Sequence, residues 1–282
     1  MSIIGAIGSR LRLPRRDPQA PVLLIGGQKC GSTTLADDLA QCSELHVDLE
    51  QKEISPLLWR MPDQLWQWNY CRRLARAKPG TVPVDVSSFY SMRQRQAVDL
   101  NRLALMPGSP KVVYVVRERL ARAISHHHHD LILGLARPDF DSVATLDSDY
   151  VLNSCYGWQV QHWLGAIGQQ DLLVIKFEDY IDDRIGTVRA ICDFVGVSSA
   201  GSDRIDATAA LNVSAKRSAL PGAVQRVVRH PLYRRTVRTT VPQRFRHRLR
   251  SAVSVDAPTK PAAPLSVTSE RLAVRFDEDQ AL

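Results

Sequence analysis

Short apolar runs alternate with stretches of helical spacing along most of the chain before residue 199. Four runs are almost continuously apolar and rich in β-branched residues: "APVLLIGG", whose strand ends at Gly26, "TVPVDVSS", "KVVYVV" and "DLLVIKFED". Runs that are apolar without alternation are typical of strands buried on both faces, as in a parallel sheet covered by helices. The pattern therefore predicts an α/β protein with three α/β/α layers around a central, mostly parallel sheet.

The helical spacing lies between and after these runs. "TTLADDLAQC" follows the first strand, and later helices are predicted in "RLARAISHHHHDLIL", "SCYGWQVQHWLGAIG" and "RIGTVRAICDFVG", the last ending at Gly196 as a C-terminal stop. Residues 62–80 are predicted to be helical or irregular. After residue 199 the strand pattern ends, and a basic helical region, the loop "DAPTKPAAP" and a short helix near Val267 to Phe276 are expected.

The composition fits a folded chain, since 44% of the 282 residues are hydrophobic and can form a substantial core. No apolar run is long enough to span a bilayer. The first residues have neither the charge order nor the apolar length of a secretory signal, so a cytoplasmic protein is expected. The five cysteines are odd in number and form no CxxC pair, which indicates reduced thiols and no zinc site.

The basic residues are concentrated in one segment. Residues 216–250 contain eleven Lys or Arg and no acid, which leaves 26 of the 37 basic residues against all 29 acidic ones elsewhere. This distribution argues against a nucleic-acid footprint over the whole surface. For the segment itself, a solvated helical face is the simplest interpretation. Attraction of an anionic acceptor, or peripheral contact with a lipid surface, is the second, and RNA binding is least favoured because few aromatic residues accompany the charges.

The stretch "LLIGGQKCGSTTLADDL" combines a strand, a glycine-rich turn and a helix start, which together can hold a phosphate group. The first turn of a helix leaves N–H groups unsatisfied and carries positive potential, and glycines let the backbone close around an anion. Lys29 adds a full charge, while Ser32, Thr33 and Thr34 can donate hydrogen bonds. A plain strand-to-helix turn is the alternative, but packing alone does not require this density of glycine, lysine and hydroxyl groups.

The order of the motif differs from the common nucleotide-triphosphatase loop, GxxxxGK[ST], because Lys29 precedes Gly31. "QKCGSTTL" instead resembles the 5′-phosphosulfate loop of sulfotransferases that use 3′-phosphoadenosine 5′-phosphosulfate (PAPS), in particular the carbohydrate, heparan-sulfate-like branch and its bacterial relatives. A second motif, "RERLARAISHHHH", follows "KVVYVV" and resembles the family's 3′-phosphate motif through Arg117, Arg122 and Ser125. A guanidinium at a strand end and a serine on the next helix can converge on one dianion.

The resemblance implies a P-loop-type fold and a set of functional residues. PAPS would be bound by Lys29, Cys30, Gly31, Ser32, Thr33, Thr34, Arg117 and Ser125. "SAKRSALP" weakly resembles the family's tail loop, whose lysine and arginine close over PAPS, which adds Lys216 and Arg217. In "QKEISPLLW", Glu53 matches the base that takes the acceptor proton, and Lys29 would neutralise charge on the leaving phosphate oxygen. The acceptor would be a hydroxyl or amine of a carbohydrate, glycolipid or small natural product, and the product nucleotide adenosine 3′,5′-bisphosphate (PAP), with no metal required.

Several positions depart from the family pattern. Ser55 stands where histidine is common, and Val86 where heparan-type members often carry a lysine, which argues against a highly anionic glycan acceptor. "VDVSSFY" resembles the segment Glu-x-Ser/Thr-Pro-x-Tyr, with Asp85 in place of Glu. The resemblance divides the chain into an extension (1–20), a PAPS-binding sulfotransferase domain (21–210) and a basic helical region (211–282) packed on or extending that domain.

Two other functions stay open at this point. A P-loop kinase or nucleotide hydrolase of related fold would need a carboxylate at a strand end to hold magnesium, and Asp85 is the one feature in its favour. A non-catalytic nucleotide-binding relative is the other. The run His126 to His129 could suggest a metal, but successive helix positions point about 100° apart and cannot converge on one ion, so the run is expected on the helix surface near the nucleotide. Asp37 and Asp38 are expected to complement the dipole of their helix.

Overall fold

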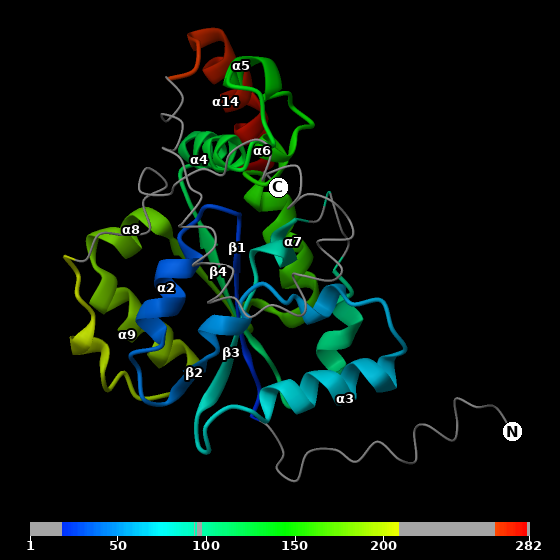
Figure 1. Ribbon diagram of the computed structural model, residues 1–282, viewed down its shortest axis with the longest axis vertical. Coiled ribbons are helices and arrows are strands. Elements are labelled where there is room, and N and C mark those ends of the chain that lie inside the picture. The colour runs from blue at the N-terminus through cyan, green and yellow to red at the C-terminus, as the bar shows by residue number, and fades with distance from the viewer. Residues whose placement is uncertain (1–18, 93, 95–97, 209–262, 281–282) are drawn as a thin grey trace, which may run out of the picture. The chain divides into compact units, whose positions relative to one another are not determined.

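The computed structural model describes residues 19–92, 94, 98–208 and 263–280 (Figure 1). The predicted basic segment 216–250, with Lys216 and Arg217, and nearly all of the predicted extension 1–20 lie outside these residues. The described chain divides into two compact units. The sheet unit comprises residues from 19–118, 155–208 and 278–280, and the helical unit comprises residues 119–154 and 263–277.

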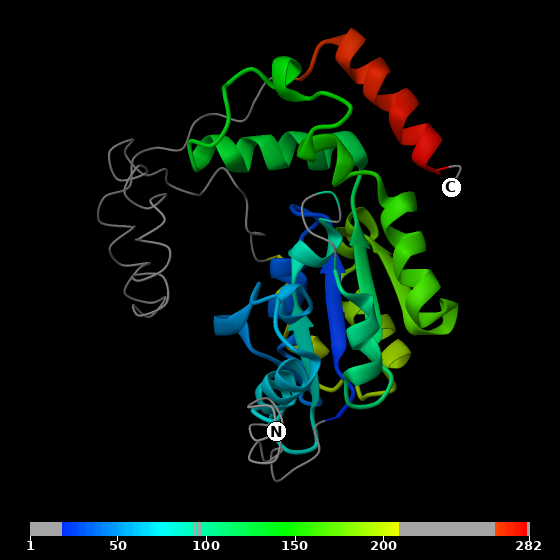
Figure 2. The ribbon, with the colours of Figure 1, turned by 90° about the vertical axis from the view of Figure 1, so that its right-hand side faces the viewer.

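The sheet unit is built on five strands that pair in parallel in the order β2-β3-β1-β4-β5. Their bounds are β1 Val22–Gly26, β2 Leu45–Val47, β3 Val82–Val86, β4 Lys111–Val116 and β5 Leu172–Lys176. The central strands β1 and β4 run side by side (Figure 2) and bury their apolar side chains almost completely. The predicted α/β class with a parallel central sheet is confirmed.

Helices cover both faces of this sheet (Figure 1). On one face lie α2 (Ser32–Leu39), α8 (Phe177–Asp182) and α9 (Arg184–Val195), and on the other α3 (Asp63–Leu74) and α7 (Tyr156–Ile167). As predicted, α9 ends at Gly196, which adopts φ 84°. Short 3-10 turns connect the elements: η1 Leu49–Gln51, η2 Pro56–Leu58, η3 Ser88–Ser91, η4 Leu100–Leu105, η5 Gln169–Asp171 and η6 Ser202–Arg204.

The sheet differs from the prediction at its two edges. The strand β2 was not predicted, because its three residues are too few to form an apolar run. The last strand was predicted to extend through Asp179, but β5 ends at Lys176 and α8 begins at once, with Glu178 and Asp179 in its first turn. Acidic side chains in the first turn stabilise a helix through its dipole, which explains why the helix starts here. As an edge strand, β5 is only partly covered, and Val174 is 44% exposed.

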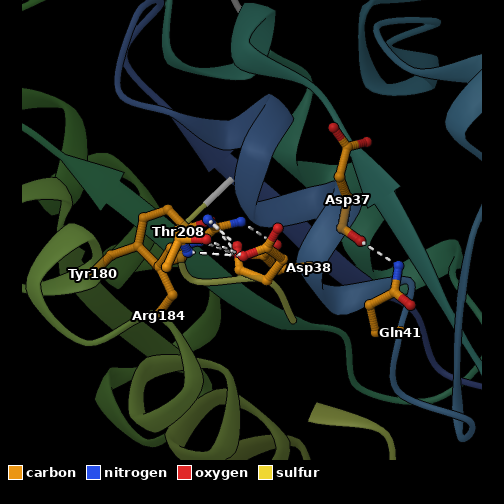
Figure 3. A network of polar contacts seen from close by, with 7 residues as sticks. Asp37, Asp38, Gln41, Tyr180, Arg184 and Thr208 are labelled. Atoms are coloured by element: carbon orange, nitrogen blue, oxygen red, sulfur yellow. Dashed lines mark hydrogen bonds and ion pairs between the residues drawn. The ribbon is translucent and has the colours of Figure 1, made fainter. Parts of the chain in front are cut away.

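A buried ion pair fastens α2 to the helices beside it (Figure 3). Asp38 accepts hydrogen bonds from Arg184 at 2.7 and 2.9 Å, and from the Tyr180 hydroxyl at 2.5 Å. The Arg184 guanidinium also donates to the carbonyl of Asp206. The prediction that Asp37 and Asp38 complement the dipole at the start of their helix is therefore wrong, since neither lies in the first turn of α2. The buried Asp38 carboxylate instead joins α2, α8 and α9. The Asp37 carboxylate, in contrast, is half exposed and lies 3.5 Å from Lys52 Nζ.

The helical unit contains α4 (Arg119–Ile132), α5 (Phe140–Val143), α6 (Asp149–Leu152) and most of α14 (Ser266–Gln280), which is longer than the helix predicted there. His126, His127 and His128 are buried, so the expected position on the helix surface is wrong. Their partners come from later in the chain: the His126 ring lies edge-on to Tyr150 and the His127 ring edge-on to Phe140.

The described residues contain neither a cluster of potential metal ligands nor a helix suited to cross a membrane. No group of three potential metal ligands lies together in that part of the chain. Within the same residues, no helix combines the length and the apolarity needed to cross a bilayer.

Candidate active site

The loop between β1 and α2 has a strained, glycine-dependent backbone. The Cys30 N–H donates to the Gly27 carbonyl at 3.0 Å and closes a turn, and α2 then begins at Ser32 with Gly31 as its N-cap. Lys29 has φ 78°, a left-handed conformation that a non-glycine residue adopts at a cost of about 1–3 kcal/mol. Strain of this kind persists where the surrounding structure fixes it, and here it falls on the one lysine of the loop.

Gly31 could not be replaced without moving an aromatic ring. Its φ is 85°, and a Cβ atom built on it would lie 2.5 Å from the ring of Phe177, the first residue of α8. Among the described residues no side chain caps the N-terminus of α2. The first N–H groups of this helix therefore remain available to an anion.

Arg117 joins this loop from the end of β4. Its guanidinium donates to the Lys29 carbonyl at 3.0 Å and lies 4.6 Å from the centroid of the Phe177 ring. Phe177 thus supports both motifs, although sequence reasoning did not identify it. The structure brings the predicted residues Lys29 and Arg117 together at the carboxyl ends of the adjacent strands β1 and β4, where ligands of open α/β sheets bind.

The other predicted donor-site residues differ in exposure. Thr33 is exposed, whereas Ser32 and Thr34 are buried and Cys30 is fully buried, with its sulfur 3.5 Å from the hydroxyl of Tyr156. Ser125 lies on α4 in the helical unit and is partly buried. Its pairing with Arg117 on one phosphate stays a prediction, as do the roles of Lys216 and Arg217 outside the described residues.

Glu53 lies at the carboxyl end of β3, the strand that pairs with β1. Its N–H donates to the Val86 carbonyl at 2.9 Å, and its backbone is left-handed, with φ 62°. Its carboxylate accepts the Ser88 N–H at 2.9 Å and the Ser87 hydroxyl at 3.4 Å. Burial raises the pKa of Glu53 above its ordinary value, and the hydrogen bonds from Ser88 and Ser87 offset part of that rise. The carboxylate is therefore held in place and made a stronger base than an exposed glutamate.

A second carboxylate, that of Asp85, is buried inside the sheet unit. Asp85 is 2% exposed, and its Oδ2 accepts the hydroxyls of Tyr70 at 3.2 Å and Tyr90 at 3.0 Å. Tyr90 in turn accepts the Leu57 N–H at 3.3 Å, which fixes the segment that follows Glu53. Burial also raises the pKa of Asp85, and the two tyrosine hydroxyls engage its carboxylate inside the sheet unit. The one feature that favoured a P-loop kinase thus has a structural role.

The side chains in the hydrogen-bond network of the Glu53 carboxylate are uncharged serines. Ser55, which is also left-handed at φ 55°, is buried and hydrogen-bonds the Ser87 hydroxyl at 2.6 Å. Ile54 follows Glu53 and Phe89 follows Ser88, and both are more than one-third exposed, while Lys52, which precedes Glu53, pairs with Asp37. The segments that carry Glu53 and Ser88 therefore each expose an apolar residue.

Comparisons with known proteins agree with this geometry. A family model described as "Sulfotransferase domain" matches residues 19–221. Heparan sulfate glucosamine 3-O-sulfotransferase 6 of Homo sapiens is 25% identical over 199 residues, covering 67% of this chain and 55% of that protein. The 3-O-sulfotransferase 3B1 of Homo sapiens is 25% identical over 198 residues, covering 66% and 48%.

The chain thus spans about half the length of the curated relatives that it matches. Among solved structures, a sulfotransferase from Alicyclobacillus acidocaldarius shares the fold with a TM-score of 0.59 at 18% identity, over 93% of each chain. The family model covers well over half of the sequence, and its match includes both the loop at Lys29 and the strand end at Arg117. This chain belongs to the sulfotransferase family.

Proposed function

We propose that this chain transfers a sulfuryl group from PAPS to a hydroxyl or amine of an acceptor. The observation that carries the proposal is the hydrogen bond between Arg117 and the strained loop at Lys29, because it joins two anion-binding elements at the ends of adjacent strands. A double-ended phosphate ligand such as PAPS needs two such elements.

In the proposed reaction the acceptor oxygen or nitrogen bonds to the sulfur as the sulfur–oxygen bond to the 5′-phosphate breaks. Glu53 takes the acceptor proton, and a positioned base of this kind contributes about 10²–10⁴-fold. Lys29 and the N–H groups of α2 neutralise the charge that develops on the leaving phosphate oxygen, so PAP departs as a stabilised anion. The raised pKa of Glu53 supports the role of base, since it brings the carboxyl closer to working pH.

The surroundings of Glu53 favour an acceptor with a neutral or apolar body. Ile54 and Phe89, which follow Glu53 and Ser88 in the sequence, are exposed apolar residues, and the Ser55–Ser87 pair is uncharged. Neutral sugars, glycolipids and small natural-product alcohols therefore fit better than a highly sulfated glycan. Peripheral contact of residues 216–250 with a lipid surface, the cytoplasmic location and the domain bounds remain predictions of the sequence.

Two experiments test the proposal. The first is transfer of labelled sulfate from PAPS across a panel of neutral sugars, lipid alcohols and N-sulfated heparan chains. Labelling of neutral or lipid alcohols is expected, and labelling of heparan chains alone would contradict the proposed acceptor class. A chain that binds PAP but labels no acceptor would favour the non-catalytic relative.

The second experiment measures thermal stabilisation by PAP and by ATP with magnesium. PAP should raise the unfolding temperature, and stabilisation by ATP with magnesium alone would contradict the proposal. Lys29→Ala and Arg117→Ala should abolish the PAP effect. The matched control is Arg189→Ala, which removes a charge from an exposed ion pair with Asp203 and should leave PAP binding unchanged.

A further inference from the structure

The buried Tyr156 hydroxyl contacts both segments of the donor site, the loop after β1 and the end of β4. Tyr156, the first residue of α7, is 7% exposed. Its hydroxyl accepts the Arg117 N–H at 3.3 Å and lies 3.5 Å from the Cys30 sulfur. Because the oxygen already accepts from Arg117, its own proton can point toward the sulfur. The phenol therefore links the loop after β1 to the residue after β4.

The contact with Arg117 fixes the backbone from which its side chain starts. β4 pairs with β5 as far as Val116, so Arg117 lies just beyond the ladder of the sheet. At this position the Tyr156 hydroxyl accepts the hydrogen bond from the Arg117 N–H. From this fixed backbone the guanidinium reaches the Lys29 carbonyl and the face of Phe177.

The start of α7 is itself held by a distant carboxylate. Asp279 is fully buried and accepts the Gly157 N–H at 2.9 Å through Oδ2 and the Trp158 N–H at 3.0 Å through Oδ1. A carboxylate on the first N–H groups of a helix satisfies them and matches the helix dipole. Gly157 is required for this approach, because a Cβ atom there would lie 2.0 Å from the Asp279 carbonyl oxygen.

We propose that Tyr156 and Asp279 are positioning residues of the donor site. Asp279 fixes the first turn of α7, and Tyr156 transmits that position to Arg117 and Cys30, so that the phosphate-binding groups are preorganised before the nucleotide arrives. The inference rests on the proposed function, because the ligand is the nucleotide of the transfer reaction. If the two residues acted only in stability, their loss would lower the unfolding temperature without changing nucleotide affinity.

The test is the affinity for PAP, measured by isothermal titration calorimetry on variants whose far-UV circular dichroism matches the wild type. Tyr156→Phe removes the hydroxyl and keeps the ring, and PAP should bind about tenfold more weakly, as expected for one or two lost hydrogen bonds. Asp279→Asn keeps one acceptor oxygen, and a loss of about threefold is expected.

Two matched controls separate positioning from stability. Tyr70→Phe also removes a buried tyrosine hydroxyl, but one that binds Asp85 rather than the donor loop. Glu278→Gln makes the same kind of change as Asp279→Asn at an exposed neighbouring position of α14. Both controls should bind PAP like the wild type.

A double-mutant cycle tests the route through Arg117. The loss of PAP affinity caused by Tyr156→Phe should be smaller in an Arg117→Lys background, because lysine lacks the guanidinium group that Tyr156 positions. A wild-type chain that binds no PAP would overturn the proposed function and this inference together. A wild type that binds PAP, with Tyr156→Phe and Asp279→Asn binding equally well, would overturn the inference alone. If Tyr156→Phe does not fold, the Asp279→Asn result decides.

Discussion

The segments around Lys29 and Glu53 solve the same local problem by different means. Each lies at the carboxyl end of a central strand, and each carries a functional side chain on a left-handed, non-glycine backbone. The Lys29 loop is fixed at its backbone, by the packing of Gly31 against the Phe177 ring and by hydrogen bonds from Cys30 and Arg117. Glu53 is fixed mainly by hydrogen bonds, from Ser88 and Ser87 to its carboxylate and from its own N–H to β3.

The difference follows from what each segment has to do. A phosphate-binding loop presents backbone N–H groups and a permanent charge, so a rigid shape is sufficient. A base has to hold a proton in one state and release it in another, and its pKa depends on burial and on the number of hydrogen bonds to its charged form. Packing fixes geometry, whereas hydroxyl groups fix geometry and also adjust the pKa.

The largest predicted effect concerns Glu53. Glu53→Gln keeps the shape but removes the base, and transfer to any acceptor should fall by about 10²–10⁴-fold. PAP affinity should be unchanged, since the donor loop is held independently.

Because the pKa of Glu53 is raised in the folded state, its ionisation weakens folding as pH rises above the ordinary glutamate pKa. The variant should therefore unfold at the same or a higher temperature at neutral pH. Unchanged turnover would remove Glu53 from the role of base.

The next effect tests the packing on the donor side. Asp38→Ala leaves the buried Arg184 and the Tyr180 hydroxyl without their shared partner, and the free energy of unfolding should fall by about 3–5 kcal/mol. Urea denaturation measures this loss, with Asp37→Ala on the exposed neighbour as control. A loss below about 1 kcal/mol, the range of surface pairs, would show that packing rather than this ion pair holds α2.

A smaller loss is expected for Gly31→Ala. The alanine must adopt a left-handed backbone and displace the Phe177 ring, which should cost about 1–3 kcal/mol of stability and weaken PAP binding. Gly165→Ala is the matched control, because Gly165 lies in α7 and a Cβ atom built on it would have nothing within 4 Å. It should be neutral or slightly stabilising. Equal stability of both variants would mean that the loop is not fixed by its packing.

The smallest effect concerns the hydroxyl groups beside Glu53. Ser87→Ala removes a donor to the ionised carboxylate, so the pKa of Glu53 should rise further. The transfer rate depends on the deprotonated form of Glu53. The rising limb of the rate plotted against pH should therefore move to higher pH by less than about one unit. Rate profiles against pH measure the shift, with the exposed Ser142→Ala as control. A shift to lower pH would contradict the proposed hydrogen bond.

The parts of this molecule that the sequence could predict are those specified by neighbouring residues. Long apolar runs identified the central strands, and the motif at Lys29 places glycine, lysine and hydroxyl groups within a few positions. The buried histidines were misjudged because their aromatic partners, Phe140 and Tyr150, follow after loops that periodicity cannot place. Tyr156 and Phe177 were missed for the same reason, since Arg117 and Tyr156 lie 39 positions apart in the sequence.

The cap on α7 also bears on how this chain leaves the ribosome. Asp279 follows Gly157 by 122 residues. At a synthesis rate of about 5–20 residues per second, the first turn of α7 waits about 6–24 s for its carboxylate. During that interval the first turn of α7 lacks its cap, and a nascent chain is expected to bind nucleotide less tightly until the last turn of α14 has emerged.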